Sequence, residues 1–494
     1  MQENNNSQSY RSIFKATSLF GGIQAYQILI TIVKSKIVAV LLGPLGVGVQ
    51  GLLTSATDMI KQITSLGISQ SAVRDVSEAN ASQNQERVAL IVTVLRRIVW
   101  WTGLLGMLSV MFLSPYLSKI SFGNYDYTIP FIFLSVTLLL DQLCAGQKVL
   151  LQGMRRLKDL AKASAIGATI GLLVSVPIYY FFRIKGIVPT LILHSVTTLL
   201  LSWYFSRRIK LDKVEVTPKK ILEEGKFMLR MGLAMSVSGI LSTAASFVLR
   251  GLIRKWGGTE DVGLYQAGFV IINTYVGLVF SAMSTDYLPR LSAVNKDNDK
   301  CREIICQQGE VATLIMAPML TFCIIFMPIV IFILYSDKFL PANDFIIWAS
   351  LAMMFKLASW LISFEFVAKA ESKLFMINEL LANIYFLVLN IIGYKLYGLS
   401  GLGLSYLINY FIYFVQVYLI ATKKYRFSFT KGFKVNFLIQ LAILLACFVI
   451  AKLFNNWLVY IVGVPFIMVS LYHSLYNLNK QMDLSSFLKN RFKK

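Results

Sequence analysis

The sequence predicts an all-α membrane protein with about fourteen transmembrane helices. Hydrophobic residues make up 56% and charged residues 15% of its 494 residues, and the mean hydropathy is +0.64, whereas about a quarter of a soluble domain is charged. Most of the 48 lysines and arginines lie in alternate gaps between long apolar runs. Because cytoplasmic segments of membrane proteins are enriched in Lys and Arg, this alternation predicts that both termini lie in the cytoplasm.

Each apolar run is about as long as the roughly 20 residues that a helix needs to cross a bilayer. Residues 1–10 are polar, and the run that follows lacks a small-residue cleavage site, so the first span is expected to remain uncleaved. The expected spans are 14–42, 46–73, 88–113, 127–152, 160–182, 187–206, 227–249, 262–289, 309–335, 343–368, 374–394, 399–422, 435–451 and 457–476.

The largest basic gap, Arg207–Lys226, separates six spans from eight. Thr217 and Pro218 within it have the pattern of a helix N-cap followed by proline at the first helical position, which predicts a short helix on the membrane surface. We therefore expect an N-terminal six-helix lobe at 1–206, a cytoplasmic linker at 207–226, a second six-helix lobe at 227–422, and an additional helix pair with a basic tail at 423–494.

A short internal similarity spans this boundary. Gly46 and Gly51 flank the start of the second span, and Gly263 and Gly268 flank the start of the eighth with the same spacing. Six helices per repeat preserve the orientation of a chain in the membrane, so the two lobes are predicted to be parallel repeats about an axis along the membrane normal.

The sequence lacks the residue patterns that several functional classes require. There is no phosphate-binding G-x-x-x-x-G-K-[ST] loop, and the only histidines are His194 and His473, without the spacing of zinc ligands. The five cysteines lie in spans or in a cytoplasmic gap, so no disulfide framework is predicted. The net charge of +23 follows the gaps and forms no single stripe, which disfavours nucleic acid as a partner. We therefore predict no catalytic residue, no metal site and no cofactor.

Charged residues inside the spans are the candidates for function, because a charge near a helix centre costs roughly 2.5–3.5 kcal/mol on insertion scales and normally faces a cavity or a partner. Asp58 and Lys61 are three residues apart and share a helix face, where they form either a structural ion pair or part of a site. The residues expected to line a cationic lumen are Lys34, Lys61 and Lys356. The acids that could bind a coupling ion are Asp58, Asp141 and Glu365.

Two further features are located near the ends of spans. Arg250 and Arg254 follow the seventh span on the expected outer side, where they either guard an outer vestibule or contact lipid phosphate. The last two spans have no charge at mid-membrane, and their faces are expected to be apolar and to contact lipid chains.

The junction of the first two spans carries a family resemblance. Residues 36–48 read KIVAVLLGPLGVG, and Ser65-Leu66-Gly67-Ile68 and Ala72-Val73-Arg74 follow downstream. This resembles the start of bacterial oligosaccharide flippases, the O-antigen and enterobacterial-common-antigen type, in the multidrug/oligosaccharidyl-lipid/polysaccharide exporter superfamily. Many O-antigen flippases have twelve spans, however, whereas fourteen are expected here, as in the lipid II flippases of the same superfamily.

The resemblance implies a V-shaped, two-lobed transporter in the bacterial inner membrane that moves an undecaprenyl-pyrophosphate-linked oligosaccharide by alternating access. The same resemblance implies membrane lipids as partners and, as further partners, the polysaccharide polymerase and chain-length machinery. The alternatives are a lipid II flippase, a multidrug or cation antiporter of the same fold, and a membrane glycosyl-transfer enzyme. The sugar composition, the coupling ion and the oligomeric state stay open.

Overall fold

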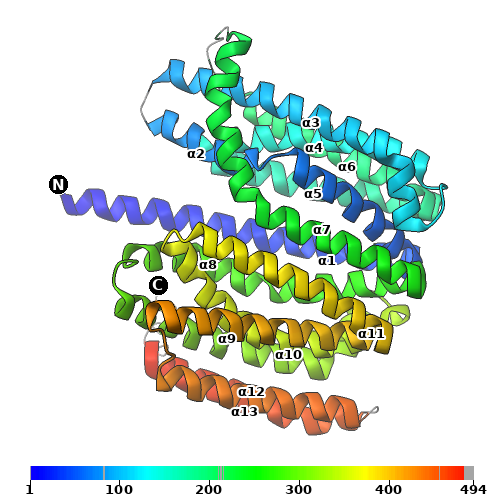
Figure 1. Ribbon diagram of the computed structural model, residues 1–494, viewed down its shortest axis with the longest axis vertical. Coiled ribbons are helices and arrows are strands. Elements are labelled where there is room, and N and C mark those ends of the chain that lie inside the picture. The colour runs from blue at the N-terminus through cyan, green and yellow to red at the C-terminus, as the bar shows by residue number, and fades with distance from the viewer. Residues whose placement is uncertain are drawn as a thin grey trace. The chain divides into compact units, whose positions relative to one another are not determined.

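The computed structural model describes residues 2–81, 84–209, 211, 214, 216–454 and 457–482, and over these residues it is helical without a β-strand. The helices divide into two compact units, Met1–Gly263 and Leu264–Lys494, and one helix, α7, runs from the first unit into the second (Figure 1). The lobe boundaries expected from the basic linker stay a prediction.

The first unit is formed by the helices up to the first part of α7. They are α1 (Gln2–Thr64), α2 (Ile68–Ala81), α3 (Gln85–Phe122), α4 (Thr128–Gly153), α5 (Leu157–Phe182), the short 3-10 helix η1 (Arg183–Gly186), α6 (Ile187–Ser206) and α7 (Pro218–Val270). An apolar cluster from α2, α3 and the end of α4 packs with Met228 of α7 in the core of this unit.

The second unit contains the remaining elements. They are the π-helix η2 (Ile271–Val276), α8 (Leu278–Ala293), α9 (Asn298–Leu334), the 3-10 helix η3 (Asp337–Phe339), α10 (Ala342–Ala368), α11 (Ser372–Tyr425), α12 (Lys431–Leu453) and α13 (Leu458–Met482). Helix α10 is the most deeply buried of them, since nearly all its residues from Phe345 to Phe366 are covered by neighbouring helices.

Ten helical segments in the described chain are long and apolar enough to cross a membrane. Three of the longest helices contain a break in which the backbone leaves the helical conformation, at Gly43 in α1, at Gly258 in α7 and at Tyr397–Gly398 in α11. All three breaks fall in gaps expected between two spans. The all-helical membrane fold is thus confirmed, while the count of fourteen spans and their orientation stay predictions.

Helix α11 is a hairpin of two helices. The hydroxyl of Ser405 donates a hydrogen bond of 2.7 Å to the carbonyl oxygen of Leu389, although 16 residues of continuous helix would separate them by about 24 Å. The close approach requires a small residue, because a Cβ atom on Gly393 would lie 2.5 Å from the carbonyl oxygen of Gly401. Helix α1 also reverses direction at its break, as the blue segments of Figure 1 show.

Two expected boundaries are wrong. The second span was expected to run from 46 to 73, but its helix ends at Thr64, and α2 begins at Ile68 after a turn in which Leu66 and Gly67 both have positive φ. The helix expected at Pro218 does begin there, but it is not a short surface helix, because it continues without a break as far as Gly258. Apolar residues such as Ile221 and Met228 anchor its first turns on the core of the first unit.

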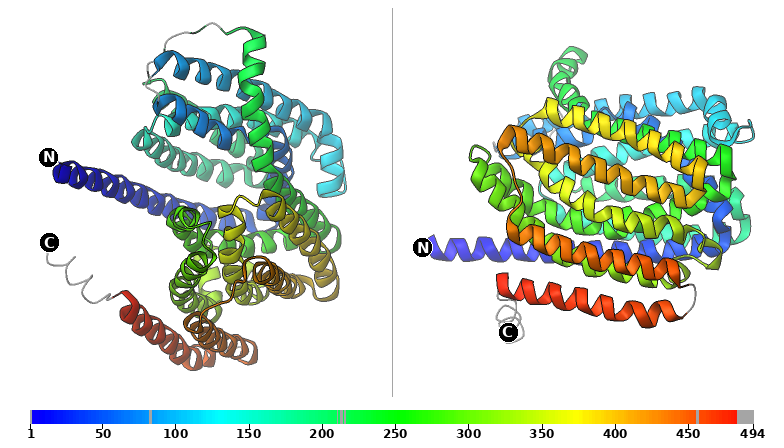
Figure 2. Two further views of the ribbon diagram at one scale, coloured as in Figure 1. Left: turned by 60° about the vertical axis from the view of Figure 1, so that its left-hand side comes forward. Right: turned by 60° about the horizontal axis from the view of Figure 1, so that its bottom comes forward.

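The last two helices, α12 and α13, lie side by side (Figure 2), and their facing surfaces are not simply apolar as expected. The Gln440 amide donates to the carbonyl oxygen of Ser470 at 3.2 Å and to the hydroxyl of Ser474 at 2.8 Å, and it accepts from the Ser470 hydroxyl at 2.7 Å. Towards the cytoplasmic end expected for α13, His473 lies 3.1 Å from the Asn436 side chain. A polar ladder therefore joins the two helices, which suits an environment where apolar contact alone gives little specificity.

Candidate functional site

In the first unit, the strongest charged contact within the membrane spans joins α1 to α4. The ammonium group of Lys61 lies 2.7 Å from Oδ2 of Asp141, and these side chains are 37% and 31% exposed. Partial exposure shows that the pair borders open space instead of being enclosed in the core. Sequence analysis expected both residues to be functional but paired Lys61 with Asp58, its neighbour on the same helix.

Asp58 and Arg250 extend this charged cluster. Asp58 is exposed and lies within electrostatic reach of Lys61, Asp141 and Arg250. Arg250 is 6% exposed, and its guanidinium group donates to the carbonyl oxygen and the hydroxyl of Ser246 on the previous turn of α7. The first unit thus gathers two acids and two bases from three helices.

Lys34 approaches the same region from the first half of α1. It is half-buried, and it acts electrostatically on His194 of α6, which also experiences the charges of Asp141 and Lys148. His194 packs against Gly171 of α5, where a Cβ atom would lie 2.7 Å from its Nδ1 atom. Lys34 and Asp141 thus both act on His194, while a site shared by Lys34 and Lys61 stays a prediction.

Arg254 lies one helical turn beyond Arg250. Its guanidinium group lies against Gly123 at the end of α3, where a Cβ atom would come within 2.1 Å of Nη1. The role of Arg250 and Arg254 at an outer vestibule stays a prediction.

In the second unit, polar and aromatic side chains surround the ammonium group of Lys356. The Lys356 ammonium group donates to Oδ1 of Asn273 at 2.9 Å, and it lies over the rings of Phe280 and Tyr410 at 5.7 and 5.2 Å. The hydroxyl of Tyr406 also donates to Oδ1 of Asn273 at 2.9 Å. The ammonium group is thus held by an amide oxygen and π faces, which stabilise a cation.

Asn273 is a candidate site residue that sequence analysis did not identify. It lies in the π-helix Ile271–Val276, a rare form of helix that is frequent at functional sites. Its Nδ2 group donates to the carbonyl oxygen of Phe269 at 3.3 Å, so the side-chain oxygen is oriented towards Lys356 and Tyr406. The only available signal was an uncharged amide within an apolar run, which does not distinguish a site from ordinary helix packing.

Glu365 does not join Lys356. It lies nine residues further along α10, about 14 Å away along the helix axis, and it is 1% exposed with one carboxylate oxygen 3.7 Å from the Lys369 ammonium group. Lys369 also donates to the carbonyl oxygen of Asn295 and to Oδ1 of Asn298, at 2.8 and 2.6 Å. This cluster ties the end of α10 to the start of α9, and an ion-coupling role for Glu365 stays a prediction.

A second polar group in this unit lies between the two halves of α11. The hydroxyl of Tyr413 donates to Glu379 at 2.9 Å, and the amide of Gln416 donates to Oδ1 of Asn378. The hairpin brings Glu379 against a tyrosine 34 residues later in the chain.

The first unit also contains an apolar cavity of about 770 Å³ between the start of α4, η1 and α6. Ile129, Phe133 and Ile192 contribute to its walls, and Asp126 and Lys185 are its charged residues. Among the residues that the structure describes, no group of three histidine, cysteine or acidic side chains could hold a metal ion.

Solved transporters share this arrangement of helices. An inward-facing multidrug resistance MATE family transporter of the MOP superfamily superimposes with a TM-score of 0.69 at 15% identity, covering 81% of this chain and 94% of that one. The lipid II flippase MurJ, in an inward closed conformation, gives a TM-score of 0.67 at 14% identity and covers 94% of this chain and 99% of that one. The protein is therefore a multi-pass membrane protein with the fold of the MOP transporters.

The sequence comparisons narrow this class to a family. Residues 37–344 match the polysaccharide biosynthesis protein family, and the chain belongs to it. Proteins called lipid III flippase from Escherichia coli (strain K12) and Shigella flexneri are 22% identical over 389 residues, which covers 77% of this chain and 91% of theirs. The resemblance to oligosaccharide flippases of this superfamily is thus confirmed, and the relatives are flippases and transporters, not enzymes.

Proposed function

We propose that this protein is a flippase that moves an undecaprenyl-pyrophosphate-linked oligosaccharide, an O-antigen or related surface polysaccharide repeat unit, across the bacterial inner membrane by alternating access. The family and the lipid III flippase relatives support a lipid-linked oligosaccharide as substrate. The choice of an O-antigen type of oligosaccharide rests on the sequence around Gly43–Gly48.

The observation that carries the proposal is the chemistry of the two lysine sites. A pyrophosphate cannot enter hydrocarbon without compensating charge, so a protein that moves it needs ammonium or guanidinium groups within the membrane. Lys61 and Lys356 are such groups, and among the residues that the structure describes each has one close oxygen partner from another helix, Asp141 and Asn273 respectively. A phosphate oxygen can replace either partner as the acceptor of the ammonium N–H.

The aromatic residues around Lys356 fit the other part of the substrate. Tyr406 and Tyr410 pack with ring centroids 4.9 Å apart beside the ammonium group, and such rings offer flat faces and hydroxyl groups to a sugar. The prenyl tail can stay in lipid while the head group crosses. We propose that Asp58, Asp141 and Glu365 are the acids able to bind a coupling ion, and that polymerase and chain-length proteins receive the product outside.

The test is replacement of the three lumen lysines in a strain that lacks its own copy of the gene. We expect the K34A/K61A/K356A variant to be inserted at normal levels but to give less than about a tenth of the wild-type surface polysaccharide, since the pyrophosphate loses its counter-charges. The matched control is K255A/K338A/K431A, which removes three exposed lysines outside the spans and should keep normal polymer levels.

The polymer level and two further assays separate the alternatives. Normal polymer in K34A/K61A/K356A would contradict the cationic lumen. Rescue of a strain that lacks its lipid II flippase would assign the chain to lipid II instead, and export of cationic dyes by the wild type with no effect on polymer would identify a multidrug antiporter.

A further inference from the structure

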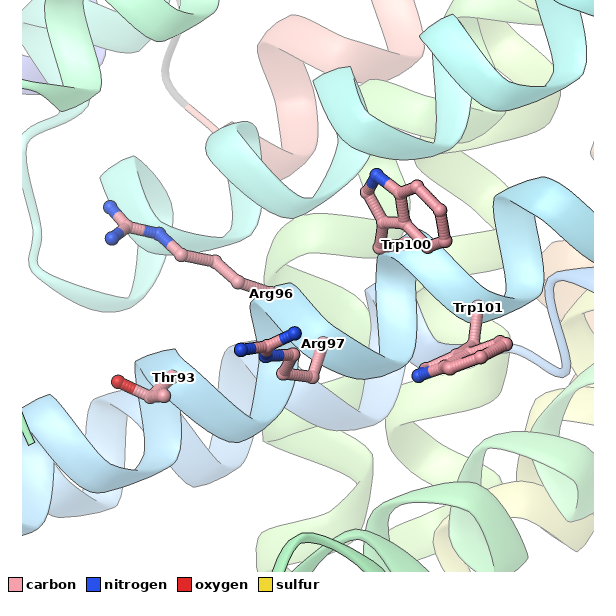
Figure 3. Close-up of a pocket in the computed structure, with 5 residues that line it drawn as sticks. All are labelled: Thr93, Arg96, Arg97, Trp100 and Trp101. Atoms are coloured by element: carbon pink, nitrogen blue, oxygen red, sulfur yellow. The ribbon is translucent and has the colours of Figure 1, made fainter. Parts of the chain in front are cut away.

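The first half of α3 carries a basic and aromatic group that the proposed function does not use. Arg96, Arg97, Trp100 and Trp101 line a shallow pocket of about 400 Å³ together with Thr93. Figure 3 shows the two arginine side chains on one side of this group and the two indole rings on the other, one helical turn further along α3. The indole rings are 5.9 Å apart and nearly perpendicular.

The position of this group along α3 fits a membrane interface. Arg97 and Lys119 are 22 residues apart on one continuous helix, a length of about 33 Å that matches the roughly 30 Å hydrocarbon core of a bilayer. Matching the core to this segment places Arg97 at one surface and Lys119 at the other, and it shifts this span from the expected 88–113 towards the C-terminal end of α3. In the topology expected from the alternation of basic residues along the whole chain, the gap before this span is cytoplasmic, which places the Arg97 end in the cytoplasmic leaflet.

The two guanidinium groups have no partner within the described part of the protein. Neither Arg96 nor Arg97 forms an ion pair, a hydrogen bond or a ring contact with another described residue. Other arginines near the same surface are engaged, since Arg87 pairs with Glu224 at 2.7 Å and Arg208 donates to the hydroxyl of Tyr204 at 2.8 Å. Unpaired guanidinium groups at a membrane surface are available to an external anion.

An exposed apolar stripe continues from Arg97 towards the membrane centre. Trp101, Leu105, Leu108 and Phe112 follow Arg97 at helical spacing on one face of α3, and they are 64%, 52%, 37% and 76% exposed. This face is long enough to contact an acyl chain over about 17 Å. A ligand that matches both parts has an anionic head group and a long apolar tail.

We propose that this surface of α3 binds one anionic phospholipid of the cytoplasmic leaflet, with its phosphate on Arg96 and Arg97 and an acyl chain along Trp101–Phe112. Guanidinium groups bind phosphate oxygens through paired N–H donors, and indole rings favour the head-group region. Free phosphate would leave the apolar stripe unused. The inference requires that α3 crosses the membrane with its Arg97 end towards the cytoplasm, and it is independent of the proposed function.

The test uses the purified full chain in nanodiscs, with brominated lipids as quenchers of tryptophan fluorescence. The fluorescence of Trp100 and Trp101 is obtained as the difference in tryptophan fluorescence between the wild type and the W100F/W101F variant. We expect brominated phosphatidylglycerol to quench it at a lower mole fraction than brominated phosphatidylcholine, with a preference of roughly fivefold for each arginine.

Substitution of the arginines should remove this preference. In R96Q/R97Q, brominated phosphatidylglycerol and phosphatidylcholine should quench equally, whereas R96K/R97K should keep part of the preference because the charge remains. The matched control is R207Q/R208Q, which removes two arginines at the end of α6 that already stack on Trp203, Tyr204 and Phe205 and should keep the full preference.

Four results would overturn the proposal. Equal quenching by both lipids in the wild type would show no preference, and equal loss in R96Q/R97Q and R207Q/R208Q would show a general effect of surface charge. Loss of the preference on adding inorganic phosphate would identify a free-phosphate site. Displacement by equimolar undecaprenyl pyrophosphate would assign the surface to that lipid instead.

Discussion

Lys61 in the first unit and Lys356 in the second each have an ammonium group held by an oxygen from another helix, but the two oxygens differ in charge. Lys61 meets the carboxylate of Asp141, and Lys356 meets the amide of Asn273. A charged partner offsets much of the cost of placing an ammonium group within the membrane, whereas an amide offsets less and leaves the positive charge available. Without substrate, the ammonium group of Lys356 is therefore more available to bind an anion than that of Lys61.

The Lys61–Asp141 pair predicts non-additive substitutions. K61Q leaves the Asp141 carboxylate without a cation, and D141N leaves the Lys61 ammonium group without an anion, so each single variant should lower the free energy of unfolding. The double variant K61Q/D141N should recover about 1 kcal/mol of the summed losses, a modest value because both side chains are about a third exposed. Thermal unfolding in detergent measures this coupling, and strictly additive losses would show that the contact contributes nothing.

Charged site residues could be predicted from the sequence because their cost in a membrane is large and demands an explanation. Their partners could not be predicted, since Lys61 pairs with Asp141, which is 80 residues away on α4, and not with Asp58 on its own helix. Asn273 was beyond sequence analysis for a different reason. A neutral amide costs little in a helix, and only the packing of η2 against α10 and α11 shows that its oxygen is directed to Lys356 and Tyr406.

At the scale of elements, the breaks at Gly43 and Gly258 define where long helices turn. Their backbone angles, φ 65° with ψ −175° and φ 85° with ψ 178°, lie in a region that is almost exclusive to glycine. No heavy atom lies within 4 Å of a Cβ built at either position. Any cost of a side chain there is therefore a cost of backbone conformation and not of crowding.

We predict that G43A and G258A each lower the free energy of unfolding by about 1–3 kcal/mol. The matched control is G167A within α5, where the added Cβ would make ordinary contacts of 3.4 and 3.6 Å and the helical backbone gains up to about 1 kcal/mol. Thermal unfolding of the three purified variants gives the comparison. A stability of G43A equal to that of G167A would show that the break at Gly43 is not strained by a side chain.

The polar ladder between α12 and α13 supports a second prediction at this scale. Q440L removes an amide that forms hydrogen bonds with Ser470 and Ser474, so it should weaken the pairing of the two helices by about 1 kcal/mol. L438A, on the exposed face of α12, should have little effect. Cross-linking between cysteines introduced on the two helices measures the pairing, and equal cross-linking in Q440L and wild type would contradict the prediction.

Periodicity and hydropathy could predict nearly all of the helices, because span length and charge follow directly from the thickness of the bilayer. They could not predict where a helix breaks within an apolar run. The turn at Leu66 and Gly67 divides one expected span, and its glycine fits against the backbone of Gly232 in α7, where a Cβ would lie 2.1 Å from the carbonyl oxygen. That contact is tertiary and leaves no periodic signal in the sequence.

For the whole molecule, the orientation in the membrane is the main prediction that follows from charge. Single cysteines introduced at Tyr125, Lys338 and Lys395 should react with impermeant reagents from the periplasm, and one at Lys431 only from the cytoplasm. These positions are exposed, and the five native cysteines are buried, so background labelling should be low. Labelling of position 431 from the periplasm would contradict the fourteen-span topology.

The contrast between the two lysines also determines how the membrane voltage acts on the protein. Lys61 and Asp141 together carry no net charge, so moving this pair along the membrane normal does no electrical work. Lys356 has only an amide and aromatic rings as described partners, and one full charge crossing the field changes the free energy by about 2.3 kcal/mol per 100 mV. A movement of Lys356 along the membrane normal would therefore be sensitive to voltage, and a bound pyrophosphate would reverse the sign of the charge on which the field acts.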